Sequence, residues 1–231
     1  MRTNVKICFT MDCTQSMGPW MDAAKDHIQE LIYDARAQHP DSRFEVGFVG
    51  YRDYGSKRQH IVFDFMEPEE LVRHIRPIQP LDGDDEAEDV AWGLFHTSTL
   101  SWGNANVKMV YHIADAPAHG DFFTRGHVSD RFPEGDPKFL DPRQMIKEWS
   151  HQGYHYTFVR ITRFTDTMVE HFHNVWMGSG TFRVIDLSQR GPHGFLDTIR
   201  ESINETLTQH TASQDPAEGS DSPRQLSCWS H

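Results

Sequence analysis

The chain has 231 residues, a formal net charge of -12 and three cysteines. This length suits one α/β domain followed by a tail, and the negative charge argues against a nonspecific nucleic-acid binder, which needs clustered Lys and Arg. Three scattered cysteines form neither a disulfide framework nor a zinc cluster. Because the first residues lack the pattern of a signal peptide and no apolar run is long enough to cross a bilayer, we expect a cytoplasmic protein with no nucleic-acid or membrane partner.

The first predicted strand, residues 5–12, is an apolar run that ends in the carboxylate of Asp12. Thr14 and Ser16 follow at two-residue spacing, ahead of helical periodicity over residues 20–39. A strand buried on both faces places its last residue at the carboxyl edge of a parallel sheet, where open α/β folds bind ligands. Carboxylate and hydroxyl oxygens are hard donors, so this loop predicts part of a site for Mg²⁺ or Mn²⁺.

Strands and helices alternate along the rest of the chain. The apolar patterns predict strands at residues 44–51, 60–65, 107–115, 154–160 and 181–186, and helices at residues 69–75, 90–100, 141–152, 166–176 and 194–209. The connection before residues 60–65 is too short for a parallel crossover, so that strand should be antiparallel and lie at an edge. We therefore predict an α/β fold, a Rossmann-like three-layer sandwich with a mainly parallel six-stranded sheet, one antiparallel edge strand and helices on both faces.

Two segments fall outside this alternation. Residues 211–231 are polar and rich in Ser and Pro, so we expect a disordered tail after a domain at residues 1–210. Residues 116–140 form a long connection rich in Gly, Pro, Asp and aromatic residues, and such connections are often functional. Within it, Phe122 and Phe123 are predicted to form an apolar rim for a partner, with packing onto the core as the alternative.

Two further acidic segments are expected to join the first loop. Residues 81–88 (LDGDDEAE) precede the helix at 90–100, and the strand at 107–115 ends, like the first strand, in a single Asp, Asp115. The two strands that end in Asp should be adjacent, which would bring both carboxylates to the same edge of the sheet. Since Mg²⁺ takes about six oxygens and keeps several waters, Asp12, Asp115, the two hydroxyls and one acid from residues 83–86 would complete a site.

The motif DCTQS, from Asp12 to Ser16, resembles the Asp-x-Ser-x-Ser motif that opens the metal-ion-dependent adhesion site of von Willebrand factor type A domains. Thr14 stands at the first hydroxyl position. The strings GFVGYRDYG, GDDEAEDVAWGL and YHIADAPAHG are similar to the type A domains that accompany alpha-kinases and to relatives of those domains that lack a kinase. The resemblance extends over residues 5–210.

This resemblance implies a site for Mg²⁺ or Mn²⁺ made by five residues: Asp12, Thr14, Ser16, Asp85 and Asp115. Asp85 is chosen from the acidic run Asp84, Asp85 and Glu86, because the usual middle motif is altered here. The resemblance also implies a partner protein whose exposed Asp or Glu completes the coordination of the metal. It does not imply kinase activity, because the chain lacks a GxxxxGK loop and a second domain for kinase machinery.

Other interpretations compete with a binding site. Asp12 and Asp115 could simply cap turns, and the acidic run could be a solvated helix start. A Mg²⁺-dependent phosphohydrolase of the haloacid dehalogenase type also has Asp at strand ends, but it needs a second Asp where this chain has Thr14. A scaffold with an empty site is the third possibility. We expect a protein that is not an enzyme.

The histidines could suggest a zinc or iron site. His112, His119 and His127 flank the third acidic segment, and His171 and His173 follow later. Their spacing does not match HExxH, which would place two imidazoles on one helical face, so we do not expect such a site.

Overall fold

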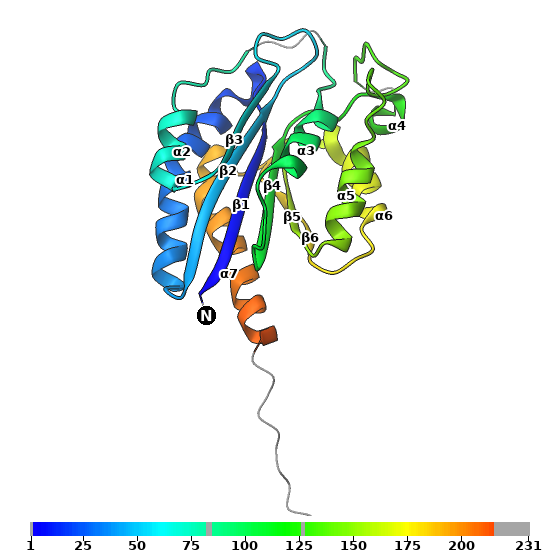
Figure 1. Cartoon of the computed structure of the whole chain (residues 1–231). Helices are drawn as coiled ribbons and strands as arrows, with labels where there is room; N and C mark the ends of the chain where they lie inside the picture. Colours follow the sequence, from blue (N-terminus) through cyan, green and yellow to red (C-terminus); the bar gives the residue numbers. More distant parts are fainter. Residues whose placement is uncertain (1, 82–84, 126–127, 215–231) are drawn as a thin grey trace, which may run out of the picture.

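A six-stranded sheet forms the centre of the computed structural model, which describes residues 2–81, 85–125 and 128–214 (Figure 1). The strands are β1 (Thr3–Asp12), β2 (Ser42–Tyr51), β3 (His60–Met66), β4 (Val107–Ala114), β5 (His155–Arg160) and β6 (Phe182–Asp186), in the spatial order β3-β2-β1-β4-β5-β6. Neighbouring strands are parallel except β3, which pairs antiparallel with β2 at one edge. The predicted fold class and the antiparallel edge strand are therefore confirmed.

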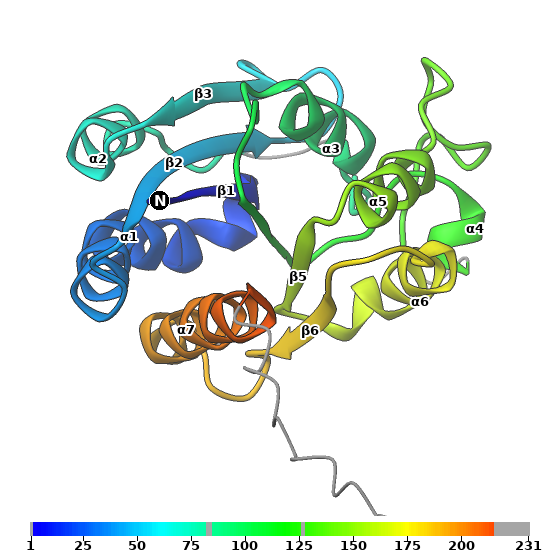
Figure 2. The same cartoon turned by 60° about the horizontal axis from the view of Figure 1, so that its bottom comes forward.

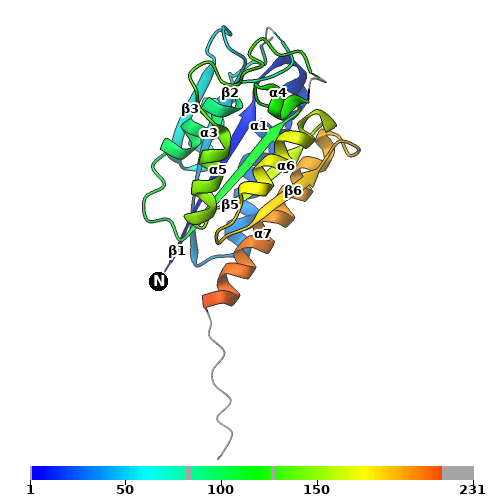
Figure 3. The ribbon, with the colours of Figure 1, turned by 90° about the vertical axis from the view of Figure 1, so that its right-hand side faces the viewer.

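Helices cover both faces of the sheet (Figure 2 and Figure 3). They are α1 (Gly18–Gln38), α2 (Pro68–Ile75), α3 (Val90–Thr99), α4 (Asp121–Thr124), α5 (Pro142–His151), α6 (Asp166–Val175) and α7 (Phe195–Gln214), with one-turn 3-10 helices η1 (Gln15–Met17), η2 (Arg163–Thr165) and η3 (Pro192–Gly194). Buried side chains of α1, α2 and α7 share one core cluster, and those of α3, α5 and α6 share the other. The result is the three-layer sandwich that the alternation of elements predicted.

The central strand β1 is apolar because both of its faces are buried. Ile7 and Phe9 are fully buried in the core under α1 and α7, whereas Cys8 points into the core under α3 and α5. A strand with helices on both sides has no solvated face, so it shows a continuous apolar run instead of alternation. This burial holds the end of β1 rigidly at the centre of the sheet edge.

Two helix boundaries bear on the predictions, the start of α5 and the end of α7. The Asp141 side chain accepts a hydrogen bond from the backbone N–H of Arg143, and Pro142 occupies the first turn of α5, as predicted. Helix α7 continues to Gln214, so residues 211–214, which we assigned to the tail, are helical. The rest of the predicted tail, residues 215–231, lies outside the described residues. None of the described helices is long and apolar enough to span a membrane.

Close packing of α3 on β2 depends on Gly93. A Cβ atom added there would lie 2.4 Å from Cδ1 of Tyr51, and the Tyr51 hydroxyl is hydrogen-bonded to Nε2 of His112 at 2.8 Å inside the core. We expect Gly93→Ala to lower the free energy of unfolding by about 1–3 kcal/mol through overpacking, despite the higher helix propensity of alanine. Urea unfolding measures this change.

The matched control is Gly18→Ala, because a Cβ atom at Gly18 would meet Cγ of Pro80 at 3.6 Å, an ordinary contact. The control should be neutral. If Gly93→Ala is as stable as the wild type, the tight packing of α3 on β2 is not what holds this side of the sheet.

Candidate metal centre

The carboxyl ends of β1, β2 and β4 lie side by side at one edge of the sheet. Strands β1 and β4 pair directly, which confirms that the two strands ending in Asp are adjacent. The chain leaves β1 through α1 toward β2 on one side, while β4 lies on the other side. Open α/β sheets bind ligands at such a point, where the connections diverge. Asp12 ends β1, Asp115 follows β4, and Asp53 follows β2 by two residues.

The first loop fixes one oxygen of Asp12 and leaves the other without a partner. Oδ1 accepts hydrogen bonds from the backbone N–H of Thr14 at 2.8 Å and from its hydroxyl at 2.6 Å. Oδ2 is buried, and none of the described residues donates a hydrogen bond to it. Burial, reinforced by the nearby carboxylate of Asp115, raises the pKa of Asp12 well above its ordinary value. A buried carboxylate oxygen without a donor is costly unless something positive binds it.

A cavity of about 350 Å³ brings the predicted residues together. Thr14, Ser16, Asp85 and Asp115 line it, and Asp12 is joined to this group through its hydrogen bonds to Thr14. Oδ1 of Asp115, like Oδ2 of Asp12, is buried and has no hydrogen-bond partner where the structure describes the chain. All five residues proposed from the sequence therefore lie in one place.

Glu88 adds a carboxylate that we did not predict. Glu88 is 4% exposed, it lines the same cavity, and its Oε2 has no hydrogen-bond partner within the described part of the chain. Burial, followed by the charges of Asp12, Asp53 and Asp115, raises the pKa of Glu88 to about 11. Such a shift means that the ionised form of this cluster needs a compensating positive charge.

The carboxylates of Asp85 and Glu86 in the acidic run make different contacts. One oxygen of Asp85 accepts the backbone N–H of Arg131, while the other is buried and has no partner in residues 2–81, 85–125 and 128–214. Burial raises the pKa of Asp85. Glu86 instead accepts the backbone N–H of Ser129 at 2.7 Å. Asp84, the remaining alternative for the middle ligand, lies outside the described residues.

A second group of possible ligands adjoins this cavity. Single ligand atoms of Asp53, Asp85 and His119 all lie within 4.8 Å of one another. The other histidines do not join this group where the structure describes them. His112 is fully buried between the hydroxyls of Tyr51 and Tyr156, and burial lowers its pKa to about 3. His127 lies outside the described residues.

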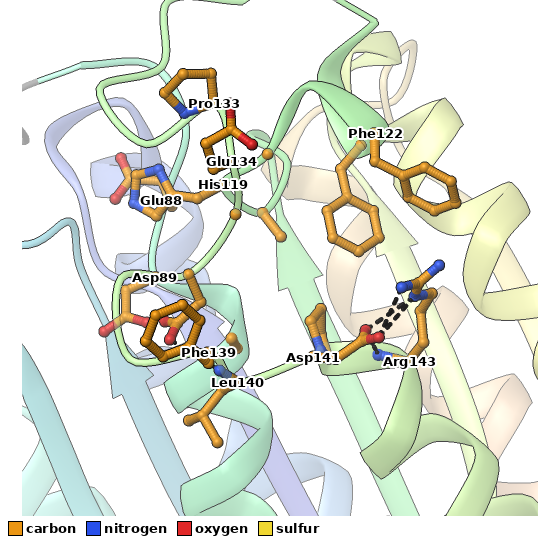
Figure 4. A pocket seen from close by; sticks show the side chains of 17 residues that line it. Glu88, Asp89, His119, Phe122, Pro133, Glu134, Phe139, Leu140, Asp141 and Arg143 are labelled. Carbon is orange, nitrogen blue, oxygen red and sulfur yellow. Dashed lines mark hydrogen bonds and ion pairs between the residues drawn. The ribbon is translucent and has the colours of Figure 1, made fainter.

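Phe122 and Phe123 line a different cavity, of about 260 Å³, in which Glu88 and His119 also take part (Figure 4). Phe122 is 50% exposed and stacks on the ring of His171. Phe123 is 6% exposed and packs against Phe172, so most of its ring is covered by the chain itself. The exposed part of the predicted rim is therefore Phe122.

Two residues near the site, Asp53 and Glu88, were not predicted from the sequence, and they differ in whether a sequence pattern could have indicated them. Asp53 follows the end of β2, so the rule applied to Asp12 and Asp115 could have found it. Glu88 does not follow the end of a strand, so this rule could not have found it. Its backbone N–H donates to the carbonyl of Pro117 at 2.9 Å, and this long-range contact directs its side chain into the cluster.

Solved structures with similar folds contain von Willebrand factor type A domains. The vWF domain of the type V pili tip protein Mfa5 from Porphyromonas gingivalis has a TM-score of 0.59 at 12% identity, covering 89% of this chain and 96% of that one. The pilus adhesin SpaC from Lactobacillus rhamnosus GG has a TM-score of 0.60 at 12% identity, covering 87% of this chain and 30% of that one. The chain therefore has the type A fold, as the sequence motifs indicated.

The sequence comparison supports the more specific resemblance. The chain is 30% identical over 172 residues to the alpha-protein kinase vwkA of Dictyostelium discoideum, a match that covers 73% of this chain. It spans only 27% of that relative's length. No protein-family model matches the chain. The resemblance to type A domains associated with alpha-kinases is thus confirmed, whereas the relative's kinase activity concerns that longer protein.

Proposed function

We propose that this chain is a protein-binding domain that works with a bound Mg²⁺ or Mn²⁺ ion. Asp12, Thr14, Ser16, Asp85 and Asp115 would hold the ion, with Glu88 beside them. The observation that carries the proposal is a set of buried carboxylate oxygens that accept no hydrogen bond from the described residues. Two of them belong to Asp115 and Glu88, which line one cavity, and the third belongs to Asp12, which is hydrogen-bonded to Thr14 of that cavity. Oxygen donors of this kind fit Mg²⁺, and among the residues that the structure describes no Lys or Arg side chain lines that cavity.

The ion would supply a positive charge with an incomplete coordination shell, which a carboxylate from a partner protein completes. Thr14 orients Asp12 through two hydrogen bonds, so the chain presents its oxygens in a fixed geometry. Exposed Phe122, on the neighbouring cavity, would provide apolar contact next to that charge. Exclusion of water around such a contact strengthens the electrostatic interaction.

We propose binding rather than catalysis as the role of this site. A haloacid dehalogenase type of phosphohydrolase needs an acid two residues after the first Asp, and that position is Thr14, whose hydroxyl donates to Asp12 at 2.6 Å. We also propose that the protein acts in the cytoplasm. Cys8 and Cys13 are buried free thiols, which is consistent with a reducing compartment.

Selection of a random-peptide library in Mg²⁺ tests the proposed binding mode. We expect the selected peptides to contain Asp or Glu, to lose binding when that residue is changed to Asn or Gln, and to lose it in EDTA with recovery on adding Mg²⁺. Peptides that bind equally well in EDTA and without their carboxylates would contradict the proposal.

A further inference from the structure

His119 belongs to a group of ligand atoms that is separate from the hydroxyl loop. It follows β4, Asp53 follows β2, and Asp85 lies before α3, and one ligand atom of each lies within 4.8 Å of the others. Ligands bound at about 2.0–2.2 Å to one ion stand about 3–4 Å apart, so small shifts bring these atoms around a single cation. His119 is 4% exposed, which keeps this group away from bulk solvent.

The imidazole of His119 is held in the orientation of a metal ligand. Its Nδ1 lies 2.8 Å from Oδ1 of Asp130. Asp130 already accepts the backbone N–H groups of Gly120 at 2.6 Å and Phe132 at 2.8 Å, so it is an acceptor and Nδ1 carries the hydrogen. A carboxylate bound to one nitrogen of a metal-ligating histidine is a frequent arrangement, because it fixes the tautomer and leaves the other nitrogen free to bind.

The second nitrogen of that ring faces the carboxylate of Asp53. Nε2 of His119 is buried and lies 3.2 Å from Oδ1 of Asp53. Oδ1 of Asp85 is buried, and no residue that the structure describes donates a hydrogen bond to it. The rings of Tyr54 and Phe132 pack against the imidazole, with centroids at 5.6 and 5.0 Å, and restrict its rotation. These atoms are fixed in place and face one another.

The number of carboxylates at this edge exceeds what one divalent ion can balance. They belong to Asp12, Asp53, Asp85, Glu88, Asp115 and Asp130. The nearby Arg52 guanidinium donates to the carbonyl oxygens of Cys13, Arg58 and Gln79. His119 contacts the carboxylates of Asp53 and Asp130, at 3.2 and 2.8 Å, and Asp53 also accepts the backbone N–H of Tyr54 at 2.6 Å.

We propose that Asp53, Asp85 and His119 bind a divalent transition-metal ion, of the Zn²⁺ or Mn²⁺ class, at a second site that adjoins the proposed Mg²⁺ site and shares Asp85 with it. An imidazole nitrogen combined with carboxylates favours first-row transition metals, whereas Mg²⁺ prefers a shell made of oxygens. His119 and Glu88 line the cavity of about 260 Å³ whose residues Figure 4 shows. Glu88 also lines the first cavity, so it lies between the two sites.

The test uses Co²⁺ as a spectroscopic probe on metal-free protein, with Mg²⁺ titrated separately by calorimetry. The variant is His119→Asn, whose amide nitrogen can replace Nδ1 in the hydrogen bond to Asp130 but offers no atom at Nε2. The control is Asp12→Asn. We expect the wild type to show a Co²⁺ absorption band that Zn²⁺ displaces and Mg²⁺ does not. His119→Asn should weaken Co²⁺ binding at least about a hundredfold and leave Mg²⁺ affinity unchanged.

The control variant separates this inference from the proposed function. Asp12→Asn should lose Mg²⁺ binding and keep the Co²⁺ band. If Asp12→Asn removes both ions, or His119→Asn leaves the Co²⁺ band intact, there is no separate site and the proposal is wrong. Thermal unfolding in EDTA verifies that each variant folds, and Asp53→Asn replaces His119→Asn if the latter does not. A wild type that binds no Co²⁺ also overturns the proposal, whatever the outcome for Mg²⁺.

Discussion

Replacing Asp12 with asparagine is expected to abolish Mg²⁺ binding and to leave the metal-free protein at least as stable as the wild type. The amide oxygen of asparagine can still accept the two hydrogen bonds from Thr14, so the local turn is preserved. The substitution removes a buried charge from beside Asp115 and Glu88, whose proximity opposes ionisation. The variant therefore lacks the charged oxygen proposed to bind Mg²⁺, and it also lacks the repulsion between the Asp12 carboxylate and its acidic neighbours.

The expected loss in Mg²⁺ affinity is at least about a hundredfold, measured by calorimetry on metal-free protein. The expected gain in stability without metal is about 1 kcal/mol, or about 2–4 °C in Tm for a chain of this size. Binding of a carboxylate peptide should be lost together with the ion. Unchanged Mg²⁺ affinity in Asp12→Asn would exclude Asp12 as a ligand and remove the proposed function. A large loss of stability in EDTA would instead assign Asp12 a structural role in the turn.

In the absence of divalent ions, the protein is expected to become more stable as pH falls from about 8 to about 6. The pKa of Glu88 is raised from 4.5 to about 11 by burial and by Asp12. The contribution of Glu88 to the free energy of unfolding is therefore fully present below its pKa in the unfolded chain. This contribution is lost as pH rises toward its pKa in the folded chain. Between about pH 6 and 8, the carboxyl group of Glu88 keeps its proton in the folded chain and has released it in the unfolded chain. A difference of one proton changes the free energy of unfolding by about 1.4 kcal/mol per pH unit. The raised pKa of Asp12 acts in the same direction.

Saturating Mg²⁺ should flatten this pH dependence, because the ion then takes the place of the proton. Urea unfolding at several pH values, with Mg²⁺ and with EDTA, measures both slopes. Glu88→Gln is the matched control: it keeps the shape of the side chain but cannot titrate, so its slope in EDTA should be smaller by about one proton. A wild-type slope that is the same with and without Mg²⁺ would contradict the proposed exchange of ion for proton.

Thermal unfolding with and without Mg²⁺ or Mn²⁺ distinguishes a binding site from a scaffold with an empty site. An ion at about one hundred times its Kd stabilises the folded state by about 2.7 kcal/mol. For a chain of this size that corresponds to about 5–10 °C in Tm. If Mg²⁺ and Mn²⁺ leave Tm unchanged at neutral pH, the scaffold interpretation is preferred.

The sequence by itself determined the sandwich and the position of the first loop, because both depend on local patterns. Continuous apolar runs in β1 and β4 predict strands buried on both faces, and parallel strands bring their last residues to one edge. Asp12 and Asp115 stand at those ends, so their meeting place followed from position alone. The short connection before β3 predicted its antiparallel pairing with β2 in the same way.

Only the tertiary structure decided which other side chains reach that edge and which are covered. Glu88 enters the cluster through a backbone bond to Pro117, and His119 is oriented by Asp130, eleven residues further along. Phe123 is covered by Phe172 of α6, although nothing in the sequence distinguishes it from exposed Phe122. These outcomes depend on contacts between distant segments of the chain, and local propensity carries no information about such contacts.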